Sequence, residues 1–383
     1  MMKTLPIFLA FLVMGITDAM GPMSDAVKNQ YQLSNVVATL LPFFALIAFA
    51  IFSVPGGVLA ARIGKKNLML LGLGMSTAAM LLPSVVAPGF ALLLASIFVF
   101  GVGTTFLQVA GNPIMRDVSA PGAYSRNLSF AQGIKGIGSA ASAYLVSAVT
   151  ALGLFVSMGW RGSFPIFCIL MAIAFVLVAT LKIEETKADV PPSIGSSLGL
   201  LKEPVFALAV LGIFLYVGAE VCMGRFLKPT LAGFGLPDDK ASLFGPTAFY
   251  LLLTIGRLVG GAVLTVISPR NFFRISALLG LLGGIALTLG TKSLTLAGVA
   301  LTGLGFANIW PMLFSITVEE KPERASELSG LMCMAIAGGA VIPLLMGQLV
   351  DMNKGSLAFM VPVVCFVYLL LISLKGGKKA VAA

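Results

Sequence analysis

The chain has 383 residues, of which 58% are hydrophobic and only 10% are charged, and it contains no histidine. A soluble domain carries about 25% charged residues, so this composition excludes a water-soluble enzyme, a coiled coil and a disordered chain. Any proton handling must use carboxylates, because histidine is the commonest proton shuttle and metal ligand. The four cysteines fall within apolar runs and lack metal-site spacing. We therefore expect a polytopic membrane protein with no disulfide, metal or other cofactor.

Twelve apolar runs are long enough to cross a hydrocarbon layer of about 30 Å as helices. They cover residues 5–26, 36–59, 67–87, 89–114, 127–152, 163–182, 204–226, 241–267, 272–291, 294–316, 327–350 and 356–374. Only helices and closed barrels satisfy their backbone in lipid, so helix-length runs predict an all-α membrane protein with twelve transmembrane helices. The polar segment 183–203 separates the sixth run from the seventh. It predicts a cytoplasmic linker between two six-helix bundles, at residues 1–182 and 204–383.

The distribution of positive charge predicts the orientation of these spans. If the N-terminus lies inside, the loops on the cytoplasmic side hold most of the 25 lysines and arginines. Cytoplasmic loops of membrane proteins carry such an excess. We therefore expect both termini in the cytoplasm, and the net charge of +10 follows from topology without a nucleic-acid partner.

The ionisable side chains inside the predicted spans include Asp18, Lys135, Glu220, Arg225 and Arg257. A charge at membrane depth costs at least roughly 2.5–3.5 kcal/mol, so each one indicates a partner or a water-lined cavity. Asp18 and Lys135 could meet if their helices are neighbours, as a static ion pair or as a pair that opens when solute or a coupling cation arrives. Arg257 could instead bond backbone carbonyls at a helix bend, and Arg225 could extend to the membrane surface.

Uncharged polar and aromatic residues inside the spans allow two interpretations. Gln108 and Asn112 lie one helical turn apart and share a face. Their amides could bind hydroxyl groups, as a sugar site requires, or could hold neighbouring membrane helices together. Tyr216 and Trp310 could offer flat apolar faces to a sugar ring, and ordinary packing is the alternative.

Several motifs resemble known sequences. The segment Gly57 to Lys66 reads GVLAARIGKK and resembles the loop signature of the major facilitator superfamily, with Ala61 where that signature has an acidic residue. Four further segments resemble the fucose/glucose/galactose sugar symporters of bacteria. They are LQVAGNP at 107–113, LYVGAEV at 215–221, IGRLVGG at 255–261 and SGLMCMAIAGGAVIPLLMGQLVD at 329–351.

This resemblance implies two six-helix bundles around a central cavity, alternating access, and cation-coupled uptake of a monosaccharide across the bacterial inner membrane. It implies that Asp18 is the carboxylate that couples transport to H⁺ or Na⁺. Gln108 falls where the fucose branch has glutamate, and a neutral amide cannot carry a proton there. Lys135 falls where the family has an asparagine, three residues after Gln132.

We therefore predict a monomeric secondary transporter for a hexose or deoxyhexose in the bacterial plasma membrane. The residues predicted to take part in cation coupling are Asp18, Lys135 and Glu220. The residues predicted to bind substrate are Gln108, Asn112, Gln132, Lys135, Tyr216, Glu220, Arg257, Asn308 and Trp310. An alternative is a transporter of a sugar acid or other small organic anion whose carboxylate is held by Lys135 and an arginine. A membrane-embedded enzyme is disfavoured, since the loops show no histidine and no glycine-rich phosphate cradle; a binding receptor or scaffold is a further alternative.

Overall fold

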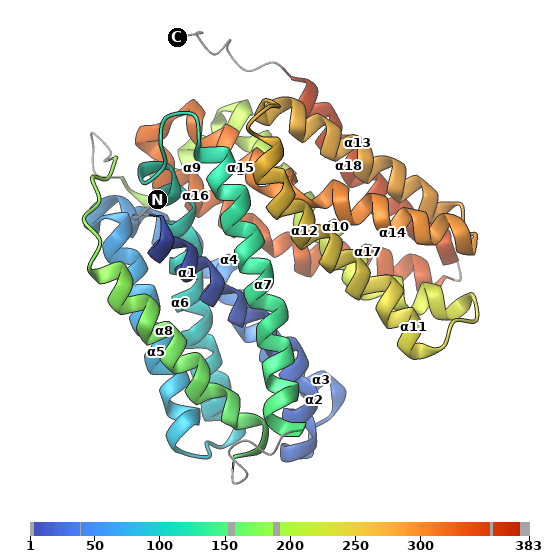
Figure 1. Cartoon of the computed structure of the whole chain (residues 1–383), viewed down its shortest axis with the longest axis horizontal. Coiled ribbons are helices and arrows are strands. Elements are labelled where there is room, and N and C mark those ends of the chain that lie inside the picture. The colour runs from blue at the N-terminus through green and yellow to red at the C-terminus, as the bar shows by residue number, and fades with distance from the viewer. Residues whose placement is uncertain (1–3, 39, 152–157, 187–191, 353–354, 376–383) are drawn as a thin grey trace. The chain divides into compact units, whose positions relative to one another are not determined.

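The computed structural model shows a helical chain that divides into two compact units (Figure 1). The residues that it describes are 4–38, 40–151, 158–186, 192–352 and 355–375. The first unit comprises Met1–Leu200 and Lys321–Met334, and the second comprises Leu201–Glu320 and Ala335–Ala383. No strand occurs in the described ranges. The predicted division into bundles at 1–182 and 204–383 remains a prediction.

Within the described residues, ten helical segments are long and apolar enough to cross a membrane, and Leu5–Ala19 is a shorter apolar segment. One more long helix, α7 (Tyr124–Ala151), spans 28 residues and corresponds to the predicted fifth span. Large apolar side chains such as Phe43, Leu46 and Ile51 are exposed on the outside of the helices. Such a surface suits acyl chains, because lipid rather than water surrounds the helices of a membrane protein.

The first unit packs its helices around α6. Its helices are α1 (Leu5–Met14), α2 (Met20–Tyr31), α3 (Asn35–Ala38), α4 (Leu40–Ile63), α5 (Lys65–Val85), α6 (Phe90–Asp117), α7, α8 (Ser163–Ala179), α9 (Ile194–Gly199) and α16 (Ala325–Met334). Helix α6 packs against α4 and α5, α5 packs against α8, and α1 packs against α7 and α8. Helix α16 lies on α4 so closely that a Cβ atom on Gly57 would be 2.6 Å from the Ser326 carbonyl oxygen. Small residues allow this approach.

The second unit is built on two central helices, α10 and α13. Its helices are α10 (Pro204–Gly233), α11 (Asp238–Ser242), α12 (Ala248–Val263), α13 (Pro269–Thr288), α14 (Lys292–Ala307), α15 (Ile309–Glu320), α17 (Gly338–Asp351) and α18 (Met360–Leu374). Helix α13 packs against α14 and α18, α12 packs against α14, and α10 packs against α17 and α18.

Four of the predicted continuous spans are interrupted. The run 5–26 contains a 3₁₀ turn at Gly15–Ala19, and the run 327–350 contains another at Ala335–Ala337. The run 241–267 bends at Gly245, just before Pro246, because proline has no N–H to continue the helix. The run 294–316 breaks at Asn308, between α14 and α15. These breaks are corrections to the sequence prediction, and two of them carry candidate site residues.

The described part of the predicted linker contacts the first unit. The Glu185 carboxylate accepts the backbone N–H groups of Lys65 at 2.5 Å and Lys66 at 2.9 Å, so it caps the start of α5. The Lys65 ammonium in turn lies 2.5 Å from the Asp117 carboxylate. Glu185 therefore supplies an acidic group beside the segment 57–66, in which Ala61 replaces the acidic residue of the signature.

The sequence analysis did not predict the short helix α9 within this linker. Ser193 caps α9 in a reciprocal pair of hydrogen bonds with Ser196. The hydroxyl groups of Ser196 and Ser197 donate to the buried carboxylate of Glu327 on α16, at 3.2 and 2.9 Å. Arg324 also donates to Glu327, so this buried carboxylate has three partners. Helix α9 is thereby fixed to the first unit.

Candidate functional site

The site in the first unit depends on a close crossing of the first span with α7. A Cβ atom on Gly138 of α7 would lie 2.0 Å from the Leu12 carbonyl oxygen of α1. A Cβ atom on Gly15 would lie 2.4 Å from the backbone nitrogen of Ser139. Only glycine fits at both positions, since the two backbones are in direct contact. This crossing places the 3₁₀ turn Gly15–Ala19 beside the middle of α7.

Asp18 lies in that turn, and its side chain is exposed. The Ser139 hydroxyl donates to Asp18 Oδ2 at 2.5 Å. Ser139 follows Lys135 by one helical turn on α7, so Asp18 and Lys135 face the same stretch of that helix. The sequence analysis missed Ser139, because its spacing along α7 does not indicate which residue of the first span it meets. Asp18 thus has a hydroxyl partner at a break in the first span.

Lys135 reaches from α7 to the neighbouring α6. Its ammonium donates to Gln108 Oε1 at 3.0 Å. Gln108 is 3% exposed and Lys135 is half-buried. A positive charge therefore lies against a neutral amide inside the first unit, within a turn of the serine that binds Asp18.

The two other predicted amides of the first unit bind each other. Gln132 Nε2 donates to Asn112 Oδ1 at 3.1 Å, and both side chains are buried. The Asn112 amide also approaches the Cys333 sulfur of α16 at 3.9 Å, and Tyr124 donates to the Asn112 carbonyl oxygen at 3.0 Å. The predicted residues Gln108, Asn112, Gln132 and Lys135 thus all lie between α6 and α7. Tyr124 and Cys333 were not among the predicted residues.

A second polar group forms around Arg257 of α12, which is 8% exposed. Arg257 Nε donates to the Ala307 carbonyl oxygen at 3.1 Å, at the end of α14. Arg257 Nη2 donates to the Tyr216 hydroxyl at 3.1 Å and lies 3.8 Å from Glu220 Oε2. The Tyr216 hydroxyl itself donates to the Phe306 carbonyl oxygen. Arg257 therefore both bonds a carbonyl at a helix break, as one interpretation of the sequence expected, and joins Tyr216 to Glu220.

Asn308 and Trp310 lie at the same helix break. Asn308 Nδ2 donates to the Gly256 carbonyl oxygen of α12 at 2.8 Å. The Trp310 ring lies 6.3 Å from the Tyr216 ring and stacks on Phe314 at 6.0 Å. Trp310 is only 4% exposed, and its Nε1 has no hydrogen-bond partner among the described residues. An unpaired buried N–H is costly, so this indole lacks a hydrogen bond that would stabilise it.

The predicted residues thus form two groups, one in each unit. The first-unit group contains Asp18, Gln108, Asn112, Gln132 and Lys135, and the second-unit group contains Tyr216, Glu220, Arg257, Asn308 and Trp310. Arg225 belongs to neither group, because it is exposed and its guanidinium lies 5.7 Å above the Phe226 ring. Among the described residues, no group of three or more acidic, cysteine or histidine side chains could hold a metal ion. The four cysteines are free thiols.

The sequence is similar to those of bacterial sugar transporters. A glucose/galactose transporter of Brucella abortus is 29% identical over 367 residues, which cover 92% of this chain and 88% of the relative. A putative glucose/galactose transporter of Helicobacter pylori is 28% identical over 396 residues, which cover 96% and 95%. The L-fucose-proton symporter of Haemophilus influenzae is 20% identical over 398 residues, which cover 94% and 93%. The predicted resemblance to sugar symporters is therefore confirmed.

The fold is also similar to solved structures. The fucose:proton symporter of Escherichia coli has a TM-score of 0.84 at 18% identity, covering 97% of this chain and 98% of that chain. A proton:xylose symporter has a TM-score of 0.74 at 14% identity, covering 97% and 94%. These likenesses confirm the predicted twelve-helix fold. A sequence profile of the Major Facilitator Superfamily matches residues 7–343, and the chain belongs to this superfamily.

Proposed function

We propose that the protein is a secondary active transporter that takes up a monosaccharide, a hexose or a deoxyhexose. The observation that carries this proposal is the group of buried amides between α6 and α7, of which Gln108 and Asn112 face the same side of α6. An amide side chain both donates and accepts hydrogen bonds, and sugar hydroxyls need partners of both kinds. The glucose/galactose and fucose specificities of the relatives support the same substrate class.

The second unit supplies groups of a complementary kind. Tyr216 and Trp310 are aromatic side chains that can stack on the apolar face of a sugar ring. The unpaired Trp310 Nε1 can donate to a hydroxyl group of the substrate. Asn308 and Arg257 hold the helix break that presents Trp310. The second unit would thus offer a sugar an indole N–H and aromatic faces.

Asp18 is the best candidate for coupling transport to a cation. It is exposed at a helix break, and the neutral Ser139 hydroxyl donates a hydrogen bond to it. Glu220 is the corresponding carboxylate of the second unit, and Arg257 lies near it. Coupling by alternating access requires that sugar and cation bind the two states of the transporter with different affinity.

The excess of lysine and arginine in alternate loops supports an orientation with both termini in the cytoplasm. We place the protein as a monomer in the lipid bilayer of the bacterial inner membrane. Cysteine-accessibility labelling of single cysteines introduced at Lys28 and Lys66 tests this topology. The proposed orientation expects only the cysteine at position 28 to react with a membrane-impermeant reagent added outside.

Counterflow in proteoliposomes tests the transport activity. Liposomes loaded with unlabelled glucose, galactose or fucose should accumulate the labelled sugar transiently, and empty liposomes should not. The variant Asp18→Asn should keep counterflow but lose accumulation that is driven by an imposed H⁺ or Na⁺ gradient. Absence of exchange with every hexose, deoxyhexose and sugar acid would refute the proposal.

One observation favours a second candidate, transport of a sugar acid. Lys135 places an ammonium against the neutral amide of Gln108, and a substrate carboxylate would bind such a cation well. In this case Lys135→Asn should abolish counterflow of glucuronate or gluconate. Neutral sugar counterflow that survives in this variant, with no acid-sugar transport in the wild type, would exclude the candidate.

A further inference from the structure

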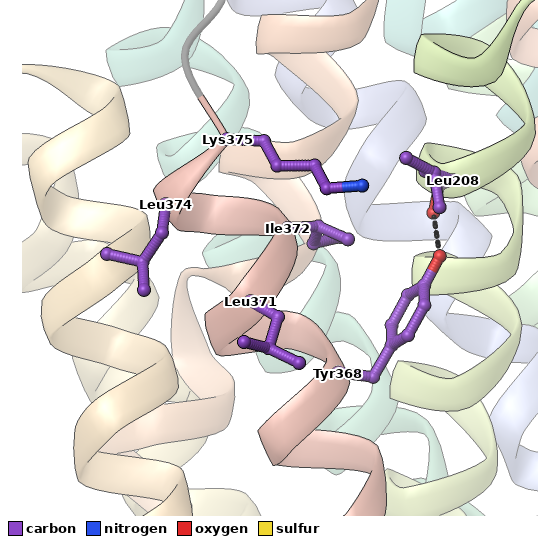
Figure 2. Close-up of a pocket in the computed structure, with 6 residues that line it drawn as sticks. All are labelled: Leu208, Tyr368, Leu371, Ile372, Leu374 and Lys375. Carbon is purple, nitrogen blue, oxygen red and sulfur yellow. Dashed lines mark hydrogen bonds between the residues drawn. The ribbon is translucent and has the colours of Figure 1, made fainter.

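A groove of about 430 Å³ opens between α10 and α18 in the second unit (Figure 2). Its lining residues are Leu208, Tyr368, Leu371, Ile372, Leu374 and Lys375. The Tyr368 hydroxyl donates to the Leu208 carbonyl oxygen at 2.9 Å, so the polar group of this wall is already satisfied. Figure 2 shows the Lys375 side chain extending across the groove, with its ammonium on the side of Leu208. The groove is therefore apolar, with a single cation above it.

The position of the groove determines what can fill it. Its α18 residues belong to the last two turns of the candidate membrane span Gly355–Leu374. Leu371 and Leu374 are both exposed. The groove thus lies at the border between the hydrocarbon layer and the membrane surface. The hydroxyl groups of a sugar find no partner on these largely aliphatic walls, whereas an acyl chain is stabilised by burying its CH₂ groups against them.

Positive charge gathers at the same end of α18. Lys375 directly follows the helix and is exposed. Arg270 and Arg274 of α13 donate to the carbonyl oxygens of Lys375 and Ser373, at 3.3 and 3.0 Å. Glu320 lies 3.9 Å from Arg270 and offsets part of that charge. The end of α18 therefore carries a net positive charge beside an apolar groove.

We propose that this groove binds an anionic phospholipid. One acyl chain lies against Leu208, Leu371 and Ile372, and the lipid phosphate accepts hydrogen bonds from the Lys375 ammonium. The two arginines on α13 add positive potential and keep the last turn of α18 in place. A zwitterionic lipid offers the same chains, but its headgroup carries its own cation and gains less from Lys375. Basic pockets beside transmembrane helices bind anionic headgroups by the same chemistry.

Native mass spectrometry of the delipidated full chain tests this proposal with phosphatidylglycerol and with phosphatidylcholine of the same acyl chains. The wild type should bind phosphatidylglycerol more tightly. One basic residue near a membrane surface contributes about 1 kcal/mol, so Lys375→Gln should weaken phosphatidylglycerol binding about fivefold and leave phosphatidylcholine unchanged. Lys240→Gln removes an exposed lysine of the same unit on α11 and should change neither lipid. Leu208→Trp fills the groove and should weaken both lipids.

Three results would overturn the proposal. Equal binding of the two lipids by the wild type would show that charge plays no part. An identical effect of Lys375→Gln and Lys240→Gln would show only a loss of overall charge. Displacement of phosphatidylglycerol by glycerol phosphate alone, at equal concentration, would identify a site for a soluble anion instead of a lipid. Thermal unfolding of each variant in detergent verifies that a lost adduct reflects lost binding and not lost folding.

Discussion

The close crossing of α1 and α7 can be tested by one methyl group. In Gly138→Ala the new Cβ would lie 2.0 Å from the Leu12 carbonyl oxygen and 2.9 Å from its carbonyl carbon. A carbon and a carbonyl oxygen approach to about 3.3 Å at the closest, so the two backbones must separate by about 1.3 Å. Both clashing atoms belong to the backbone, so a side-chain rotation cannot relieve the contact.

This separation should affect both stability and coupling. Overpacking of a tight interior costs about 1–3 kcal/mol, which predicts a clear decrease in Tm. The hydrogen bond between Ser139 Oγ and Asp18 Oδ2 is 2.5 Å long, and the same displacement would stretch it past the limit of about 3.0 Å for an O–H···O bond. We therefore expect Gly138→Ala to impair gradient-driven accumulation more strongly than counterflow.

Gly21→Ala is the matched control. Gly21 lies in α2, on the other side of the same 3₁₀ turn, and a Cβ atom there meets nothing within 4 Å. Alanine should stabilise this helix by about 0.5–1 kcal/mol relative to glycine. Thermal unfolding and proteoliposome transport of both variants decide the matter. If Gly138→Ala unfolds and transports like Gly21→Ala, the crossing does not position Asp18, and the reasoning is wrong.

Three further substitutions test other contacts. Arg257→Lys removes the planar guanidinium that bonds the Ala307 carbonyl and the Tyr216 hydroxyl. Because hydrogen bonds from charged groups contribute about 1.5–3 kcal/mol each, the rate of counterflow should fall at least about tenfold. An unchanged rate would contradict this expectation. Trp310→Phe should leave Tm unchanged or raise it, since Nε1 has no described partner. The same substitution should reduce the increase in Tm that sugar produces. An undiminished increase argues against a hydrogen bond from Nε1 to the sugar. Glu185→Ala removes the cap of α5 and should lower the free energy of unfolding by about 1 kcal/mol. A denaturant titration measures this difference. An unchanged free energy of unfolding would mean that water replaces the carboxylate.

The spans were predictable because a membrane helix needs about 20 apolar residues in one run, a property of local sequence. The breaks inside four of those runs were harder to predict. Gly245-Pro246 carried a local signal, but the 3₁₀ turn at Gly15–Ala19 occurs where α1 meets α7, a contact between residues more than a hundred positions apart. Helix α9 was missed because its cap, Ser193 with Ser196, lacks the acidic residue of the usual capping motif.

The contacts within the candidate site were likewise only partly predictable from the sequence. Spacing alone indicated that Gln108 and Asn112 share a face of α6, and the structure adds that α7 supplies their partners, Lys135 and Gln132. The Ser139 partner of Asp18 could not be inferred from spacing, because the pairing depends on which turn of α1 crosses which turn of α7. Charge at membrane depth indicated which residues were candidates. Their hydrogen-bond partners depend on tertiary packing, which the sequence does not show.

The embedded charges of each polar group have identifiable neighbours. Arg257 stays protonated at any physiological pH. It bonds the neutral Ala307 carbonyl and Tyr216 phenol, and it lies 3.8 Å from the Glu220 carboxylate. Gln108 cannot titrate, so the amide next to Lys135 cannot act as a proton acceptor. The described carboxylates of the two candidate groups are those of Asp18 and Glu220. Lys135 and Arg257 each add a positive charge to their own polar group, which disfavours a cationic ligand at either group.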